Sequence, residues 1–96
     1  MKVTIDKEAR DDLDRIRAWI CKDRPESADH VVGQILSVIG RLGRVPHLGR
    51  KSLEKDTYEL LVRSLPYVVV YEVNEALAEL TVIGVFHCAQ EQRRGN

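Results

Sequence analysis

The chain has 96 residues, which is enough for one compact domain and too few for two, so we expect a single domain over residues 1–96. Its 15 basic and 15 acidic side chains cancel, and this excludes the overall attraction to polyanions that most dedicated nucleic-acid-binding proteins have. No stretch approaches the roughly 18 apolar residues of a membrane span and the first residues include no apolar signal segment, so we expect a cytoplasmic protein with no membrane partner.

The amino-terminal part predicts a short strand followed by an amphipathic helix. The strand is the apolar run from Val3 to Ile5, and Asp6 then stands in a typical N-cap position. Apolar residues follow at spacings of four, three and four: Ala9, Leu13, Ile16 and Ile20. Charged residues fill the other faces, so the helix should pack on one side, meet water on the other, and end near Lys22.

A second helix is predicted to begin at Pro25, because proline fits the first turn of a helix. Its apolar positions again recur at three and four: Ala28, Val31, Val32, Ile35, Val38, Ile39 and Leu42. The pattern stops at Gly43, and Pro46 and Gly49 then favour a loop. Only a few residues separate the two helices, so we expect an antiparallel helical hairpin.

From Thr57 onward the period changes to that of strands. Three segments are predicted, Thr57 to Val62, Pro66 to Val73 and Leu77 to Phe86, and their short links favour antiparallel pairing. The middle segment is almost continuously apolar and should lie centrally. The order is therefore strand, helix, helix and three strands, an α+β fold with a helical hairpin packed on one face of a sheet.

One helical hairpin covers only one face of this sheet, so apolar side chains on the other face remain uncovered. Val68 and Val70 lie on the opposite side of the middle strand from Tyr67 and Val69. Large exposed apolar patches usually mark interaction sites, so the surplus predicts a partner. The alternative is partial covering by the carboxy-terminal tail or by Trp19.

The residues indicate no catalytic, metal or cofactor site. His87 and Cys88 are adjacent on a strand and should point to opposite faces, which disfavours a catalytic pair. Neither cysteine has metal-ligand spacing, and we expect both to be reduced. The acidic cluster Asp11, Asp12 and Asp14 is most simply a solvated helix face. Phosphate-binding glycine motifs are absent.

Four segments of the second half together resemble the ParE branch of the ParE/RelE toxin superfamily. In chain order they are PHLGR (46–50), TYELLV (57–62), PYVVVYEV (66–73) and VFHCAQ (85–90). The first half agrees, with its EARDDLDRI helix and its Pro25 helix start. The resemblance covers nearly the whole chain and implies the superfamily's β-α-α-β-β-β fold, a helical hairpin on a small, mainly antiparallel sheet.

The resemblance also implies a bacterial type II toxin that a neighbouring antitoxin neutralises. ParE-like members are linked to inhibition of DNA gyrase, and RelE-like members cut mRNA on the ribosome. This chain has Val68 where the nuclease pattern has an arginine, and no tyrosine follows Tyr71. Zero net charge also fits poorly with docking on a ribosome. We therefore expect a gyrase inhibitor that is not an enzyme, with a ParD-like antitoxin as partner and with nucleic acid contacted only through that antitoxin.

Two alternatives stay open: a ribosome-dependent mRNA endonuclease, for which Arg93, Arg94 and His87 remain available, and a non-toxic partner in an autorepressing toxin–antitoxin complex. The end-of-sheet segment is associated with toxicity in the family, and we hypothesise that it binds the target through His87, Gln90, Gln92, Arg93 and Arg94. Otherwise His87 merely caps the strand and the arginines point into solvent.

For the antitoxin we predict an extended apolar site. Its candidate residues are Trp19, which lies off the main helical stripe, together with Val68 and Val70. The alternative for Trp19 is burial at an edge between helix and sheet.

Overall fold

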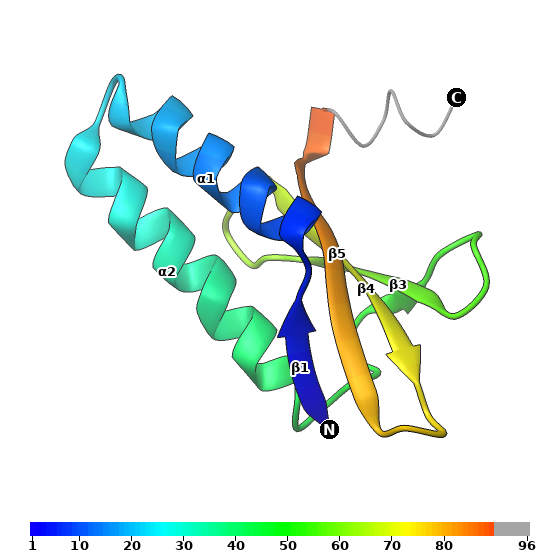
Figure 1. The fold of residues 1–96 in the computed structure, drawn as a ribbon. Helices are drawn as coiled ribbons and strands as arrows, with labels where there is room; N and C mark the ends of the chain where they lie inside the picture. Colours follow the sequence, from blue (N-terminus) through cyan, green and yellow to red (C-terminus); the bar gives the residue numbers. More distant parts are fainter. Residues whose placement is uncertain (90–96) are drawn as a thin grey trace.

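The structure is a computed structural model and describes residues 1–89 (Figure 1). Its elements in chain order are β1 (Lys2–Ile5), α1 (Lys7–Cys21), α2 (Pro25–Leu42), β2 (Arg50–Lys51), β3 (Thr57–Leu61), β4 (Tyr67–Asn74) and β5 (Glu79–His87). The predicted α+β class, the helical hairpin and the three later strands are confirmed. The short strand β2 lies in what the sequence predicted to be loop.

The strands form one five-stranded sheet in the order β1-β5-β4-β3-β2. The middle one of the three later strands, β4, is the central strand of the sheet, as its continuous apolar character predicted. All neighbouring strands pair antiparallel except β1, which pairs parallel with β5 from Lys2 opposite Glu79 to Ile5 opposite Val82. The first and last strands of the chain are therefore neighbours in the sheet.

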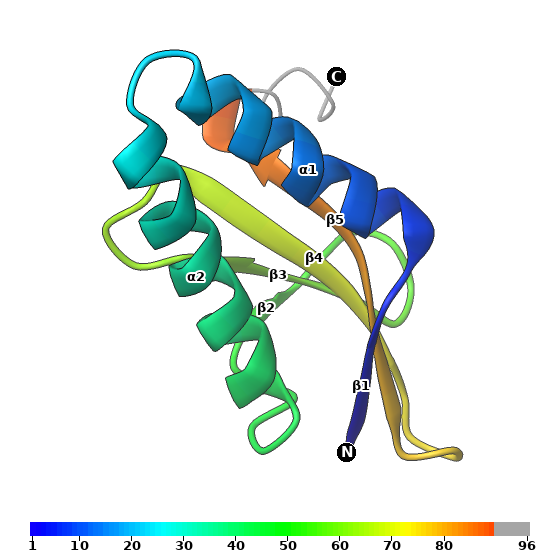
Figure 2. The same cartoon turned by 60° about the vertical axis from the view of Figure 1, so that its left-hand side comes forward.

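Both helices begin where the sequence predicted. The carboxylate of Asp6 accepts a hydrogen bond from the backbone N of Ala9 at 2.9 Å, which satisfies one of the free N–H groups of the first turn of α1. Pro25 begins α2, which ends at Leu42 before Gly43. The two helices pack antiparallel and cover one face of the sheet (Figure 2).

The core lies between this hairpin and the sheet. On the helix side of β4, Tyr67, Val69, Tyr71 and Val73 are buried and belong to one apolar cluster. The largest fully buried side chains come from every layer: Tyr71, Ile35, Leu42, Leu80, Val62, Val69 and Val82.

A β-bulge interrupts the pairing of β4 with β5. Val70 lies opposite Gly84 but Tyr71 lies opposite Val82, so Ile83 has no direct partner in the register. A strand alternates its faces with a period of two, and one extra residue reverses the alternation beyond it. Accordingly Val82 and Val85, three positions apart, both join the core on the helix side.

The sheet face opposite the helices corrects one expectation. Val68 and Val70 do lie there, but their side chains are only 4% and 8% exposed, so they are not the open apolar patch that the sequence predicted. Larger neighbours cover them, because Val68 lies between Leu61 and Phe86 in the register. The exposed apolar surface on this side includes Leu61, which is 59% exposed.

The loop after α2 is held on the helix-side surface of the sheet by aromatic rings. The rings of Tyr58 and Tyr71 stack with centroids 5.5 Å apart, and the His47 ring packs edge-on against Tyr58 at 5.5 Å. Nε2 of His47 lies 3.1 Å from a carboxylate oxygen of Glu75 in the β4–β5 turn. This loop therefore has a defined position although it contains little regular structure.

Within residues 1–89, no helix has both the length and the apolar composition needed to cross a membrane.

Candidate interaction groove beside the last strand

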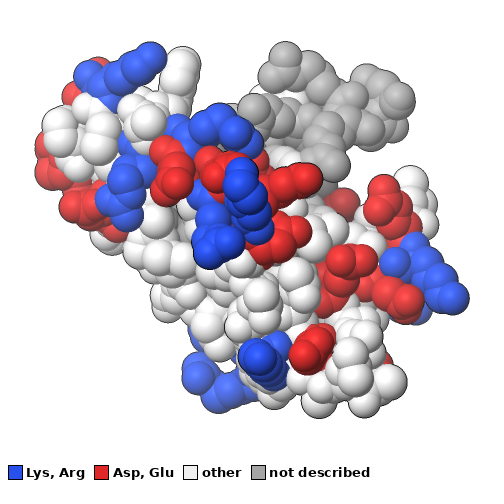
Figure 3. All heavy atoms as spheres, viewed as in Figure 1, with Lys and Arg blue, Asp and Glu red and all other residues white. Residues whose placement is uncertain are grey.

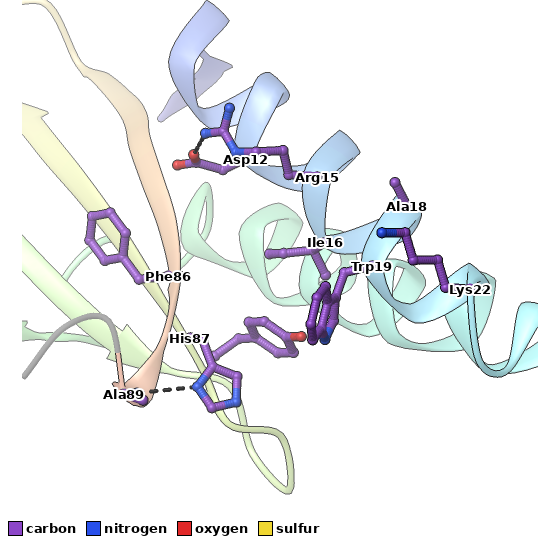
Figure 4. Close-up of a pocket in the computed structure, with 10 residues that line it drawn as sticks. Asp12, Arg15, Ile16, Ala18, Trp19, Lys22, Phe86, His87 and Ala89 are labelled. Atoms are coloured by element: carbon purple, nitrogen blue, oxygen red, sulfur yellow. Dashed lines mark hydrogen bonds and ion pairs between the residues drawn. The ribbon is translucent and has the colours of Figure 1, made fainter.

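A groove runs between α1 and the end of β5 (Figure 4). One wall is α1 and the other is the end of the sheet, and the lining residues are Asp12, Arg15, Ile16, Ala18, Trp19, Lys22, Tyr67, Phe86, His87 and Ala89. The groove therefore joins a predicted antitoxin-binding residue, Trp19, to a predicted target-binding residue, His87.

Trp19 is an exposed residue of this groove. Trp19 is 71% exposed. The Lys22 ammonium lies 5.9 Å from the centroid of its ring, which is a cation–π distance. The alternative of a tryptophan buried between helix and sheet is therefore excluded. An exposed indole next to apolar Ile16 is the kind of surface that binding partners cover.

His87 is the last residue of β5 and packs on the sheet by its ring. It meets Tyr67 edge-on, with ring centroids 5.4 Å apart and an interplanar angle of 87°. Its Nδ1 accepts a hydrogen bond from the backbone N of Ala89 at 3.2 Å, so the neutral ring carries its proton on Nε2. Burial raises the pKa of the Tyr67 phenol above its ordinary value.

The chain turns away from the sheet directly after His87. The backbone N of Cys88 donates to the carbonyl of Pro66 at 2.8 Å, which extends the β4–β5 ladder by one bond. Both cysteines are free, Cys21 exposed and Cys88 half-buried. Together with the Ala89 contact, this bond fixes the backbone of residues 88 and 89 at the end of the sheet.

Asp12 is a groove residue whose role the sequence did not indicate. One carboxylate oxygen accepts a hydrogen bond from the backbone N of Val85 at 3.0 Å, and the other is paired with Arg15. The sequence interpretation of Asp12 as a solvent-facing charge is wrong. A side chain's contact with a backbone group 73 residues away leaves no trace in local periodicity.

The four remaining predicted target contacts lie outside the described residues. Gln90, Gln92, Arg93 and Arg94 follow Ala89, the last groove residue that the structure describes. The structure thus gives the position from which this segment starts.

A second hollow, on the open sheet face, is lined by more acids than bases. Its two bases, Arg50 and Lys51, lie at its β2 edge, and Arg50 pairs with Glu59 at 3.4 Å. The acids around it are Asp6, Glu8, Asp12, Glu54 and Glu59. On the side of the molecule drawn in Figure 3, positive and negative side chains are intermixed.

Residues 1–89 include no group of three side chains able to hold a metal ion.

Comparison with known proteins decides the family. Residues 3–92 match the family described as "ParE toxin of type II toxin-antitoxin system, parDE". The chain belongs to the ParE toxin family. It is also similar to "Putative toxin Y4kP" of Sinorhizobium fredii (strain NBRC 101917 / NGR234), with 37% identity over 71 residues, 74% of each chain.

Solved structures agree with this ParE-family assignment at the level of the fold. A structure described as the chromosomal ParDE TA system from P. aeruginosa matches with a TM-score of 0.80 and 21% identity, over 91% of this chain and 95% of that one. The isolated E. coli RelE toxin matches with a TM-score of 0.68 and 16% identity, over 99% and 98%. The intact E. coli RelBE toxin-antitoxin complex gives 0.69 and 18%, over 90% and 94%. The ParE-family chain thus has the fold shared by ParE and RelE toxins.

Proposed function

We propose that this ParE-family toxin inhibits DNA gyrase by protein–protein contact and is neutralised by a ParD-like antitoxin. The observation that carries the proposal is the contrast between two surfaces. The groove beside β5 presents an exposed indole and includes Ala89 in its lining, whereas the hollow on the open sheet face is acidic. A groove of that kind suits a protein partner better than an RNA phosphate.

The antitoxin occupies the groove through an amphipathic segment. Apolar groups of that segment cover Trp19 and Ile16, and acidic groups meet Arg15 and Lys22 on the α1 side of the rim. Contacts with nucleic acid are made by the antitoxin, because the toxin itself has no net positive charge.

The target is contacted by the end of the chain. His87 orients this segment, in line with its hydrogen bond to the Ala89 amide, and the side chains of Gln90, Gln92, Arg93 and Arg94 supply donors to a polar or acidic surface of gyrase. No catalytic step is assigned to these residues, and no cofactor is required.

The first experiment measures supercoiling of relaxed plasmid by purified gyrase while antitoxin-free protein is titrated in. We expect inhibition, relieved by the antitoxin and abolished by deleting residues 90–96, with the melting temperature of the truncated protein close to that of the full chain. Full inhibition by the truncated protein would contradict the assignment of the target contacts.

Unchanged supercoiling by folded protein would contradict the gyrase assignment. Ribosome-dependent mRNA cleavage would then be assayed. Cleavage would favour the endonuclease alternative, and its absence would favour a non-toxic partner in an autorepressing complex.

The antitoxin contact is tested by Trp19→Ala, with Leu77→Ala as the matched control. Leu77 is also a large exposed apolar residue, at 64%, but it lies in the β4–β5 turn away from the groove lining. We expect Trp19→Ala to weaken antitoxin binding by about 2 kcal/mol or more, roughly thirtyfold, with stability changed by less than about 0.5 kcal/mol. Equal effects of the two variants would contradict a specific role for Trp19.

A further inference from the structure

The outer edge of β5 changes partners halfway along the strand. Up to Val82 it pairs with β1, and the last bond of this ladder runs from the backbone N of Asp6 to the carbonyl of Val82 at 3.0 Å. The chain then leaves the sheet to begin α1. Within residues 1–89, no strand pairs with this edge of β5 beyond Val82.

The Asp12 carboxylate occupies the place where a longer β1 would have continued. It accepts the backbone N–H of Val85 at 3.0 Å, in a partly buried position, and its side chain is only 17% exposed. Val85 itself is 3% exposed, so without Asp12 its N–H would lack a partner in a place that water reaches poorly. Arg15, one helical turn further on, pairs with the second carboxylate oxygen and holds Asp12 toward the strand (Figure 4).

The backbone around Val85 is built for this contact. The bulge at Ile83 turns Val85 toward the helix side, and the Phe86 ring folds back over Gly84. A Cβ on Gly84 would lie 3.0 Å from the Phe86 ring, which would have to shift, and 3.5 Å from the Asp12 carboxylate, an ordinary contact distance. The bulge at Ile83, Gly84 and the carboxylate contact at Val85 therefore fall on three consecutive residues of β5.

We propose that Asp12 is a positioning residue, whose carboxylate replaces an edge strand and fixes the terminal arm of β5, residues 85–87, against α1. The position of Ala89 follows, because the His87 ring rests on Tyr67 and accepts a hydrogen bond from the Ala89 amide. Asp12 thereby sets where the segment after Ala89 starts and the width of the groove. The structural part of this inference stands alone, and its effect on gyrase rests on the proposed function.

Amide hydrogen exchange on the 15N-labelled 96-residue chain tests the structural part. In Asp12→Ala we expect the Val85 amide to exchange at least about tenfold faster, whereas the amides of Leu80 and Val69 keep their wild-type rates. Asp12→Asn keeps a side-chain oxygen that accepts the bond, so its Val85 rate should stay within about threefold of wild type. The matched control is Asp11→Ala, which removes a carboxylate of the same helix that, within residues 1–89, pairs with Lys7 across one turn.

Unchanged Val85 exchange in folded Asp12→Ala would overturn the inference. If that variant does not fold, two measurements still decide: exchange in Asp12→Asn, and a scalar coupling across the hydrogen bond between the Val85 nitrogen and the Asp12 carboxyl carbon in the wild-type protein. Absence of the coupling together with rapid Val85 exchange in wild type would also overturn it.

The functional part is read in the supercoiling assay. We expect Asp12→Ala to need about tenfold more protein for half-maximal inhibition, Asp12→Asn to restore most of the effect, and Asp11→Ala to match wild type. Fast Val85 exchange with unaltered inhibition would overturn the link from Asp12 to the target contact. A wild-type protein that leaves gyrase unaffected would contradict the proposed function alone, since the exchange rates would still decide the positioning role.

Discussion

The hydroxyl of Tyr71 accepts a hydrogen bond from the backbone N of Gly49 at 2.9 Å. The same hydroxyl donates to the carbonyl of Pro46 at 2.9 Å. A single phenol on the central strand thus satisfies two backbone groups of the loop between α2 and β2, and it holds that loop against the sheet.

Tyr71→Phe removes both bonds and keeps the ring. We expect a loss of about 1–3 kcal/mol in the free energy of unfolding, because two partly buried backbone groups lose their partner. The matched control is Tyr58→Phe, which keeps the stacked ring pair and should change stability by less than about 0.5 kcal/mol. Urea unfolding measures both, and equal losses would contradict the assignment.

Stability should fall in alkaline solution. Burial is the main cause that raises the pKa of both Tyr67 and Tyr71 above the ordinary value of 10.0, so the folded state keeps phenol protons that the unfolded state releases. The contribution is therefore complete below about pH 10 and is lost as pH rises above it. Unfolding free energies between about pH 8 and pH 11 measure this, and Tyr71→Phe should show a shallower decline than wild type.

Two glycine-to-alanine substitutions should change the free energy of unfolding in opposite directions. A Cβ on Gly49 would lie 2.6 Å from the Glu59 carbonyl oxygen and 2.8 Å from the Tyr71 hydroxyl, and the backbone oxygen has little freedom to yield. We expect Gly49→Ala to cost about 1–3 kcal/mol. On α2, a Cβ on Gly33 would meet nothing within 4 Å, so Gly33→Ala should stabilise by roughly 0.5–1 kcal/mol. Thermal unfolding of the two variants in one buffer checks the contrast.

The N-cap of α1 is open to a direct test. Asp6→Ala removes the acceptor for the Ala9 amide and should cost about 1 kcal/mol, in the range of 0.5–2. Asp14→Ala, an exposed acid further along the same helix, is the control and should change stability by less than about 0.5 kcal/mol. A neutral Asp6→Ala would mean that the cap does not contribute to stability.

Elements with a strong period were predictable from the sequence. The apolar spacing and the flanking Asp6, Pro25 and Gly43 gave both helices, and alternation gave the three later strands. The strand β2 has only two residues in a loop rich in glycine and proline, so no period exists to reveal it. The bulge at Ile83 was also hidden, since it is defined only by the register with β4.

The candidate site was predictable only in part. Trp19 stood out because it lies off the helical stripe, and it is exposed in the groove. The burial of Val68 depends on the sizes of its cross-strand neighbours Leu61 and Phe86, which a single-strand pattern does not contain. The Asp12 contact with Val85 joins residues that only the tertiary fold brings together.

The parallel pairing of β1 with β5 has a consequence for synthesis on the ribosome. The first strand to emerge, β1, has its pairing partner in β5, so the sheet cannot be completed until residues 79–82 have left the ribosome. Contacts so distant in sequence also form slowly, because the loop-closure entropy is lost before they add stability. A nascent chain of this fold therefore stays incomplete until β5 has emerged, and the groove, which needs residues 86–89, is the last feature of residues 1–89 to be assembled.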